Sequence, residues 1–224
     1  HDPLIDEITD FLAKRGAPFR VCSTHVGSMG AIYAVKGGLA HLGGIHLLDT
    51  KTGEYNKSYV EKYFPDGEAV TLQGVGRVQG LMVKEGNPLG IKAFQDIRNF
   101  RYVNRQRGAG TRILCDFLIE QNNMSADEIS GYENEEFTHT AVAALIAAGN
   151  ADAGLGIYSA AKMYNLDFIP LCNETYDFLI VKQELENPMV KAFFEVLYSE
   201  AFSKRLAEMG GYVCKRIEAK TAKL

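Results

Sequence analysis

The 224-residue chain has no tryptophan, few cysteines and no long hydrophobic run, and these absences exclude several protein classes. No apolar run approaches the ~20 residues that a membrane-spanning helix needs. Its cysteines are far apart and form no C-x-x-C pair, so no structural zinc site is expected; they are Cys22, Cys115, Cys172 and Cys214. They lie in apolar segments, as reduced and packed thiols do, which favours a cytoplasmic location over a periplasmic or extracellular one.

An excess of basic residues is also missing. The net charge is −4, whereas nucleic-acid-binding surfaces normally carry a positive excess, so direct binding of nucleic acid by this chain is not expected. The content of 46% hydrophobic and 23% charged residues is that of an ordinary globular protein. A chain of this length can bury a full core as one large domain or as two lobes.

The known catalytic motifs are absent as well. No Walker A pattern occurs, and Gly108-x-Gly110 lacks the third glycine of a dinucleotide fingerprint because Ile113 stands there. Ser28 cannot form a nucleophile elbow, which would need glycine at Val26. The histidines show no helical spacing for metal ligands. We therefore predict no catalytic residue, no metal, no cofactor and no enzyme.

What the sequence does contain is a regular alternation of strands and helices. Strands are expected at 19–22, within 39–48, and at 68–73, 77–83, 101–103, 151–157, 167–171 and 176–181. Helices are expected from Pro3, after Gly30, at 55–64, 91–97, 112–121 and 141–148, from 158, and over 188–209. This order predicts the α/β class with largely parallel sheets. Asp2-Pro3 looks like a helix cap; because a strand normally precedes such a helix, the numbered chain is expected to be part of a longer one.

Three turns between a strand and a helix share one chemistry. They are Thr24–Gly30, Arg105–Arg112 and Thr138–His139, and they offer hydroxyls, glycine N–H groups and arginines. Free N–H groups and the macrodipole make helix N-termini attract anions, and ligands in open α/β sheets lie beyond the carboxyl ends of strands. We therefore predict that the three turns converge on an anion. A plain glycine-containing turn with solvated arginines is the alternative.

The composition of these turns indicates which anion. None of the three cores contains a carboxylate, and a site of donors alone suits a fully deprotonated oxyanion. Arg112 is expected to contact the ligand because it lies in the first turn of its helix. Arg105 and Arg107 are expected at the rim of the cleft or paired with acids. Tyr158 and Tyr176 are expected either to line the cleft or to pack, and His139 either to bind or to act as a loop or cap residue.

Five segments in order carry a family resemblance: Val26–Gly30, Gly44–Asp49, Asn104–Arg112, Phe137–His139 and Ala151–Gly156. Together they resemble the type 2 periplasmic-binding-protein-like domain of the molybdate-binding kind, over essentially the whole chain. The resemblance implies two lobes, each a mostly parallel sheet flanked by helices, joined by two hinge crossovers. Lobe I would comprise residues 1–78 and 177–224, and lobe II residues 79–176. Such domains often occur fused to a helix-turn-helix regulator or a molybdopterin-biosynthesis protein.

The resemblance also implies a ligand and a site. Molybdate or tungstate would be held between the lobes by hydroxyls and backbone N–H groups, for transport, regulation or molybdenum-cofactor biosynthesis. The expected ligand-binding residues are Thr24, Gly27, Ser28, Gly110, Thr111, Arg112, Thr138, His139 and Tyr158, with Arg105, Arg107 and Tyr176 at the rim. One departure from the pattern is that the family's first strand, and the serine ending it, would precede His1. The alternatives are a regulatory or interaction domain that binds a small organic anion or has lost ligand binding, and an enzyme domain of molybdopterin chemistry.

Overall fold

The computed structural model describes residues 2–214. The helices are α1 (Pro3–Lys14), α2 (Gly27–Lys36), α3 (Lys57–Tyr63), α4 (Gly110–Gln121), α5 (His139–Ala147), α6 (Tyr158–Met163), α7 (Pro188–Leu197) and α8 (Glu200–Met209). The strands are β1 (Leu42–Ile45), β2 (Ala69–Val83), β3 (Tyr102–Arg105), β4 (Glu135–Glu136), β5 (Ala153–Ile157), β6 (Asp167–Val181) and β7 (Tyr212–Val213). Three short 3-10 helices complete the set: η1 (Phe94–Asn99), η2 (Ala126–Glu128) and η3 (Lys182–Glu184). Within the described residues, no helix is both long and apolar enough to cross a membrane.

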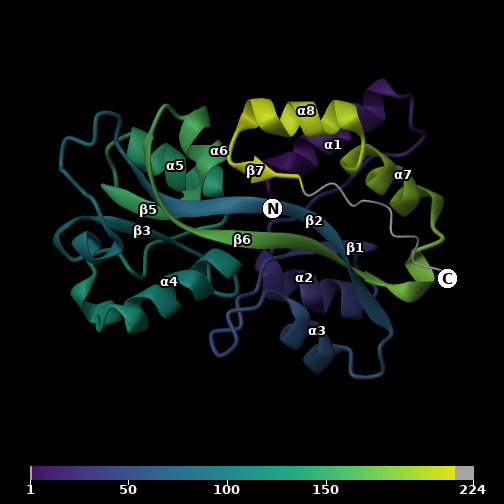
Figure 1. Cartoon of the computed structure of the whole chain (residues 1–224), viewed down its shortest axis with the longest axis horizontal. Coiled ribbons are helices and arrows are strands. Elements are labelled where there is room, and N and C mark those ends of the chain that lie inside the picture. Colours follow the sequence, from purple (N-terminus) through teal and green to yellow (C-terminus); the bar gives the residue numbers. More distant parts are fainter. Residues whose placement is uncertain (1, 215–224) are drawn as a thin grey trace.

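One mixed sheet runs through the molecule in the order β1-β6-β2-β5-β3-β4, with β7 added to β2. Its centre is the antiparallel pair of β2 and β6, two strands of 15 residues that run side by side across the molecule (Figure 1). Their register runs from Ala69 opposite Val181 to Val83 opposite Asp167. It is irregular between Leu72 and Val75 and again between Gln79 and Gly80.

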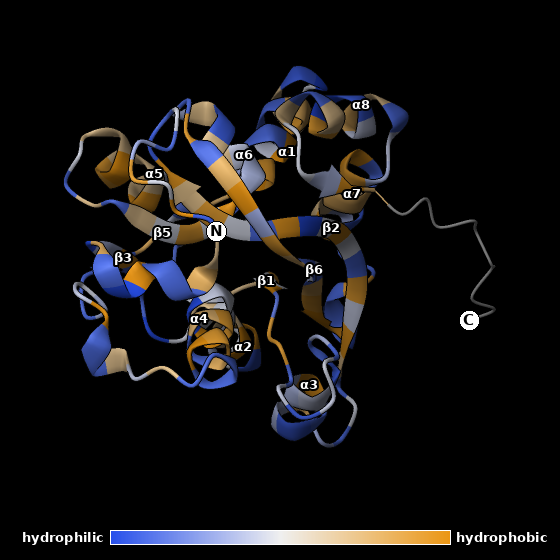
Figure 2. Cartoon of the chain, turned by 60° about the vertical axis from the view of Figure 1, so that its left-hand side comes forward, coloured by the Kyte–Doolittle hydropathy of each residue, from blue (hydrophilic) through white to orange (hydrophobic). Residues whose placement is uncertain are grey.

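Helices cover both faces of this sheet, because successive residues of a strand point to opposite faces. In one half of the sheet, Phe178 packs into the core beneath α1 and α7, whereas Leu179 packs into the core beneath α2. In the other half, Leu81 joins the core beneath α4, and Met82 joins the core beneath α5 and α6. Hydrophobic residues accordingly predominate along the central strands (Figure 2). The burial of each such side chain contributes roughly 1.5–3 kcal/mol.

The α/β class with flanking helices is confirmed, but the prediction of largely parallel sheets is wrong. β6 pairs antiparallel with β1 and β2, and β2 pairs antiparallel with β5 and β7. In the described residues, the only parallel pairs are β3 with β4 and β3 with β5. Alternation of strands and helices in a sequence predicts crossovers, but it does not reveal that two long strands return beside each other in opposite directions.

The two long strands were expected to be broken, and each is continuous. Gly74 of β2 lies between the two expected runs 68–73 and 77–83, and a Cβ added there would lie 2.1 Å from the carbonyl oxygen of Tyr176. A Cβ added at Gly80 would lie 2.3 Å from the carbonyl oxygen of Ile169. These glycines therefore permit close approach of β2 and β6, which is a recognised role of glycine inside strands.

Two further expectations differ from the structure. Phe19–Cys22 is not a strand, although its burial alternates: Phe19 and Val21 pack against the core beneath α1, and Arg20 and Cys22 are exposed. The segment has the side-chain pattern of a strand but no ladder partner among the described residues. The single helix expected over 188–209 is two helices, because Ser199 caps α8 by accepting a hydrogen bond from the N–H of Phe202 at 3.3 Å.

Candidate functional site

The structure brings the first two of the three predicted turns into contact. The N–H of Met29, in the first turn of α2, donates to the carbonyl oxygen of Gly108 at 3.1 Å. Gly27 has a φ of +72°, and a Cβ added there would lie 3.1 Å from the backbone nitrogen of Ala109. Glycine is therefore required at this position both for its backbone conformation and for the close approach. The starts of α2 and α4 consequently face each other directly.

The third turn is organised mainly by its own helix. The hydroxyl of Thr138 accepts a hydrogen bond from the N–H of Ala141 at 2.9 Å and so caps α5. The same hydroxyl lies 3.0 Å from that of Thr140. His139 is buried over β5, where a Cβ added at Gly156 would lie 3.5 Å from its Nδ1. Thr138 therefore caps its helix and His139 is packed in the protein interior, and neither role depends on a ligand.

Arg112 is expected to contact the ligand, but its side chain instead contacts carboxylates on its own helix and on β4. Its guanidinium bonds Asp116 at 3.2 Å and Glu135 at 2.9 Å, and lies 4.1 Å from the ring centre of Tyr132. Only 4% of the side chain is exposed. Its neighbour Arg107 is 74% exposed and pairs with Glu133 at 3.1 Å.

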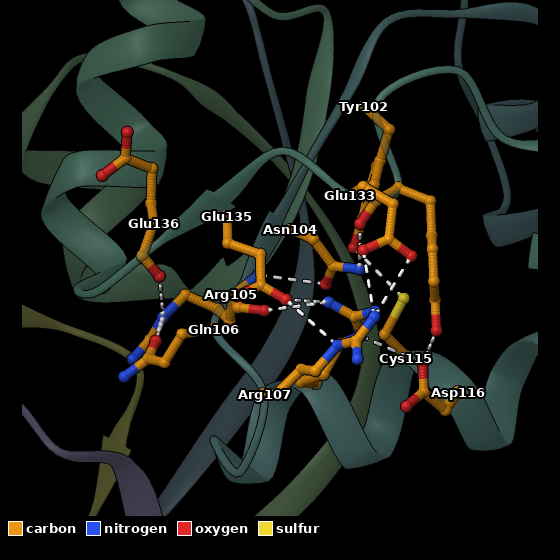
Figure 3. A network of polar contacts seen from close by, with 12 residues as sticks. Tyr102, Asn104, Arg105, Gln106, Arg107, Cys115, Asp116, Glu133, Glu135 and Glu136 are labelled. Carbon is orange, nitrogen blue, oxygen red and sulfur yellow. Dashed lines mark hydrogen bonds and ion pairs between the residues drawn. The ribbon is translucent and has the colours of Figure 1, made fainter.

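Arg105 is expected at the rim of the cleft, but the structure buries it. It ends the fully buried strand β3 and is itself only 3% exposed. Its Nε donates to Gln106 Oε1 and to the carbonyl oxygen of Glu136, both at 3.2 Å, and its Nη2 donates to the carbonyl oxygen of Phe137 at 3.1 Å. Figure 3 shows this arginine with Gln106 on one side of the strand and Arg107 with its acids on the other.

The remaining nitrogen of Arg105 is the unusual feature. Nη1 is buried and has no hydrogen-bond partner within the described residues, and the same holds for Nε2 of the adjacent Gln106. Burial, and next the charge of Arg77, lower the pKa of Arg105 to about 10. The guanidinium remains protonated near neutral pH, and the hydrogen-bond acceptors that it contacts are uncharged. A buried cation of this kind is costly unless an anion approaches it.

A buried ionic network that is not evident from the sequence lies beside this arginine. Arg77 of β2, only 1% exposed, forms ion pairs with Asp2 and with Glu174 of β6. Arg77 and Glu174 stand directly opposite each other in the ladder. The guanidinium also lies 4.3 Å from the ring centre of Tyr176, the residue expected at the rim, which is buried.

The network continues from Glu174 toward the start of α4. Glu174 Oε2 lies 2.8 Å from His46 Nδ1 and accepts a hydrogen bond from Gln79 Nε2 at 2.9 Å. The same Gln79 nitrogen donates to the hydroxyl of Thr111 at 2.8 Å. The Thr111 hydroxyl, expected to bind ligand, is therefore already linked to Glu174 through Gln79.

The protonation states within the network follow from its burial and charges. Burial alone would raise the pKa of Glu174, but Arg77 and then His46 outweigh it and lower that pKa to about 2. Burial lowers the pKa of His46, and the attraction of Glu174 does not reverse this. Near neutral pH the network therefore contains ionised Glu174 and neutral His46.

The other expected site residues are dispersed. Ser28 is buried, and its hydroxyl accepts a hydrogen bond from the N–H of His46 at 3.2 Å. Thr24 is exposed in the segment before α2. Tyr158 begins α6 and is 39% exposed, with its ring edge-on to Phe168. Gly110 packs against the backbone just after β1, since a Cβ added there would lie 2.2 Å from the carbonyl oxygen of His46.

Sequence reasoning missed Asp2, Arg77 and Glu174 as members of one cluster. A charged residue within a glycine-rich apolar strand is a signal for burial, and Arg77 carried that signal. Asp2 was interpreted as a cap only, and it does accept a hydrogen bond from the N–H of Leu4 at 2.8 Å. Within residues 2–214, no group of three or more histidine, cysteine, aspartate or glutamate side chains could hold a metal ion.

Comparison with known proteins identifies the fold and the family. The chain is 33% identical over 191 residues to YvgK, an uncharacterized protein of Bacillus subtilis; the match covers 84% of this chain but 61% of YvgK. A substrate-binding protein from Clostridium perfringens, assigned to phosphate ABC transport and containing bound phosphate, superposes with a TM-score of 0.69 at 11% identity over 95% of each chain. A substrate-binding domain from Clostridium difficile, assigned to molybdenum ABC transport, gives a TM-score of 0.59 at 14% identity over 95% of this chain and 94% of that one.

The structural neighbours share the architecture, in which helices flank a curled mixed sheet. At these levels of identity they establish the fold and not the ligand. A family model decides the assignment, because it matches residues 9–198, which is most of the chain. The chain belongs to the PBP superfamily, as a PBP-like domain.

Proposed function

We propose that this domain is a non-catalytic binding or sensing module that holds a small oxyanion, molybdate or tungstate, between two lobes. Lobe I would comprise residues 1–78 and 177–224, and lobe II residues 79–176. The two long strands β2 and β6 would then be the hinge. The observation that carries the proposal is the buried Nη1 of Arg105, which has no protein partner among the described residues.

The surroundings of Arg105 favour an anion of small size. Its Nε and Nη2 are fixed by Gln106 and by two carbonyl oxygens, so the direction of Nη1 is set before any ligand arrives. Gln106 Nε2 adds a second donor that has no partner in the described part of the chain. Gly110 and Thr111 begin α4, a helix of 12 residues, and their N–H groups have no partner within the helix. These donors are pre-organised, which lowers the entropic cost of binding.

The charges nearby support the same assignment. Arg77 is neutralised by direct contact with Asp2 and Glu174, whereas the hydrogen-bond acceptors of Arg105 among the described residues are carbonyl and amide oxygens. A bound anion would supply the missing countercharge. It would also offset the unfavourable effect of Arg77 on Arg105. Both effects strengthen binding in a buried, low-dielectric site.

The test is a series of melting experiments with the protein alone and with molybdate, tungstate, sulfate and phosphate. An anion at ~100 times its Kd should add about 2.7 kcal/mol of stability, which corresponds to roughly 5–10 °C in a domain of this size. Arg105→Ala should abolish the response. Arg107→Ala is the matched control, because it removes an exposed arginine from the same turn and should leave the response intact.

Several outcomes would contradict the proposal. A response that survives Arg105→Ala would reject the assignment of that residue, and no response to any of the four anions would reject the oxyanion reading. The second candidate, binding of a small organic anion, is favoured by one observation. Gln79 Oε1 is a buried acceptor without a partner in the described residues, and a ligand hydroxyl could donate to it. A response to hydroxy acids alone would favour that candidate.

The proposal extends to the context of the domain. As a sensor it would be fused to, or associated with, a helix-turn-helix regulator or a molybdopterin-biosynthesis module, and it would itself use no cofactor. Ligand binding shifts an open–closed equilibrium only by the difference in affinity between the two states. The melting series, repeated in the presence of such a module, would show whether the anion response is retained in the assembly.

A further inference from the structure

Two buried hydroxyls lie at matching positions on the helices whose starts face each other. Ser28 is the second residue of α2, and Thr111 is the second residue of α4. Their exposed fractions are 2% and 0%, so both are shielded from water. The two helix starts are in direct contact, because the N–H of Met29 donates to the carbonyl oxygen of Gly108. We call the hydroxyls of Ser28 and Thr111 the helix-start hydroxyls.

Each helix-start hydroxyl accepts a hydrogen bond from a nitrogen that can only donate. The backbone N–H of His46 donates to the Ser28 hydroxyl at 3.2 Å. Gln79 Nε2 donates to the Thr111 hydroxyl at 2.8 Å and to Glu174 Oε2 at 2.9 Å. An amide nitrogen carries two hydrogens, and these two bonds use both of them. Both hydroxyls are therefore acceptors toward the protein.

The carboxylate of Glu174 decides which way the amide of Gln79 faces. Burial alone would raise the pKa of this carboxyl, but Arg77 and then His46 lower it to about 2. The ionised carboxylate only accepts hydrogen bonds, so the amide presents its nitrogen to Glu174. Thr111 then receives the second hydrogen of the same nitrogen. The charge on Glu174 thus fixes the direction of the hydrogen bond that reaches α4.

The hydrogens of the helix-start hydroxyls remain available. A hydroxyl has one hydrogen and two acceptor positions, and within residues 2–214 neither Ser28 nor Thr111 donates to a protein acceptor. A buried donor without an acceptor is unfavourable, and a bound anion would supply the acceptor. The proposed anion contact is near: besides burial and the charge of Arg77, the charge of Arg105 lowers the pKa of His46.

We propose that Gln79 and Glu174 are positioning residues that set the selectivity of the anion site, although neither needs to contact the ligand. They make the Thr111 hydroxyl a donor, and the backbone of His46 does the same for Ser28. An oxyanion without a proton accepts from both hydroxyls, whereas one that retains a proton brings a donor that faces another donor. The inference rests on the proposed function and narrows its ligand to fully deprotonated oxyanions.

The test measures dissociation constants for sulfate, molybdate and phosphate at pH 7 by isothermal titration calorimetry, because phosphate alone retains a proton there. The tighter of sulfate and molybdate should bind more strongly than phosphate by roughly 5- to 150-fold, the factor for one buried donor left without an acceptor. Equal affinities, or tighter binding of phosphate, would overturn this proposal alone and indicate that an acceptor such as Gln79 Oε1 faces the anion. If no anion binds, the proposed function fails as well.

Variants separate positioning from a general change in stability, which would weaken the binding of all anions alike and leave the affinity ratio unchanged. Gln79→Met removes the donor to Thr111, whose hydroxyl can then accept from phosphate, so the ratio should fall by roughly fivefold or more. Glu174→Gln removes the charge that orients the amide and should lower the ratio in the same direction. Gln73→Met, at an exposed glutamine of the same strand, is the matched control and should keep the ratio.

The hydroxyl itself is tested by a conservative pair of substitutions. Thr111→Ser retains the hydroxyl and should keep the ratio of the parent protein, whereas Thr111→Val has nearly the same shape without the hydroxyl and should lose it. Urea unfolding of each variant shows whether the fold is intact. An unchanged ratio in folded Gln79→Met, or in folded Thr111→Val, would overturn the proposal.

Discussion

Replacement of Glu174 by glutamine tests the central network most directly. The substitution keeps the shape of the side chain but removes its charge, so Arg77 retains Asp2 as its only carboxylate contact in the structure described. Glutamine can still accept from Gln79, but it loses the charge-assisted contact with His46. Removal of one partner from a buried ion pair costs about 3–5 kcal/mol, because an uncompensated charge remains inside the protein.

The pKa of Glu174 adds a dependence on pH. Its folded-state pKa is about 2, below the ordinary value of 4.5, because Arg77 and then His46 outweigh the opposing effect of burial. At 1.36 kcal/mol per pKa unit, ionised Glu174 stabilises the folded state by about 3 kcal/mol. This contribution is complete above about pH 4.5 and is lost as the pH falls toward 2. At pH 3 about 1.4 kcal/mol of it would remain.

The measurement is urea-induced unfolding of the parent protein and Glu174→Gln at pH 7 and pH 3. At pH 7 the variant should be less stable by about 3–5 kcal/mol, and at pH 3 the difference should shrink by about 2 kcal/mol. Glu133→Gln, at an exposed acid paired with Arg107, should change stability by less than ~0.5 kcal/mol at either pH. A difference between parent and Glu174→Gln that is the same at both pH values would refute the reasoning.

Two further variants test the placement of residues at the start of α4. Arg112→Ala should lower the free energy of unfolding by about 1–3 kcal/mol, because Asp116 and Glu135 lose their hydrogen bonds to the guanidinium. The variant should leave the anion response in melting experiments unchanged. If the variant keeps its stability but loses the anion response, Arg112 is a ligand-binding residue after all. Gly110→Ala should destabilise by about 1–3 kcal/mol in urea unfolding, because its Cβ would meet the His46 carbonyl oxygen at 2.2 Å. Full retention of stability would show that Gly110 and His46 are not packed so closely.

Local patterns in the sequence predicted much of the fold. Asp2 followed by proline predicted the start of α1, and the structure confirms the cap. Thr138 was correctly placed before a helix. These features depend on residues close together in the chain, and short-range chemistry is what a single sequence displays well. The ends of individual strands were less accurate, because glycines that serve close packing resemble glycines that make turns.

The central network could not be predicted in the same way. Arg77 and Glu174 are far apart in the sequence, and only the register of β2 against β6 brings them together. Which of Arg105 and Arg112 has a nitrogen available for a ligand depends on where Asp116, Glu135 and the carbonyl group of Phe137 lie. Position in the first turn of a helix favours Arg112 as the ligand contact. In the structure, however, Asp116 and Glu135 bind that side chain, and Nη1 of Arg105 is the nitrogen that has no partner among the described residues.

The two irregularities in the β2–β6 ladder have a mechanical consequence. They lie between Leu72 and Val75 and between Gln79 and Gly80, and they bracket the Arg77–Glu174 pair. Irregularities interrupt the ladder and let strands bend locally, whereas the paired stretch between them resists bending. If the molecule opens about these strands, β2 and β6 would therefore bend at two places. The paired stretch between them, which holds Arg77 and Glu174, would stay rigid. Such a joint would transmit rotation between the two halves of the sheet while its ion pair stays intact.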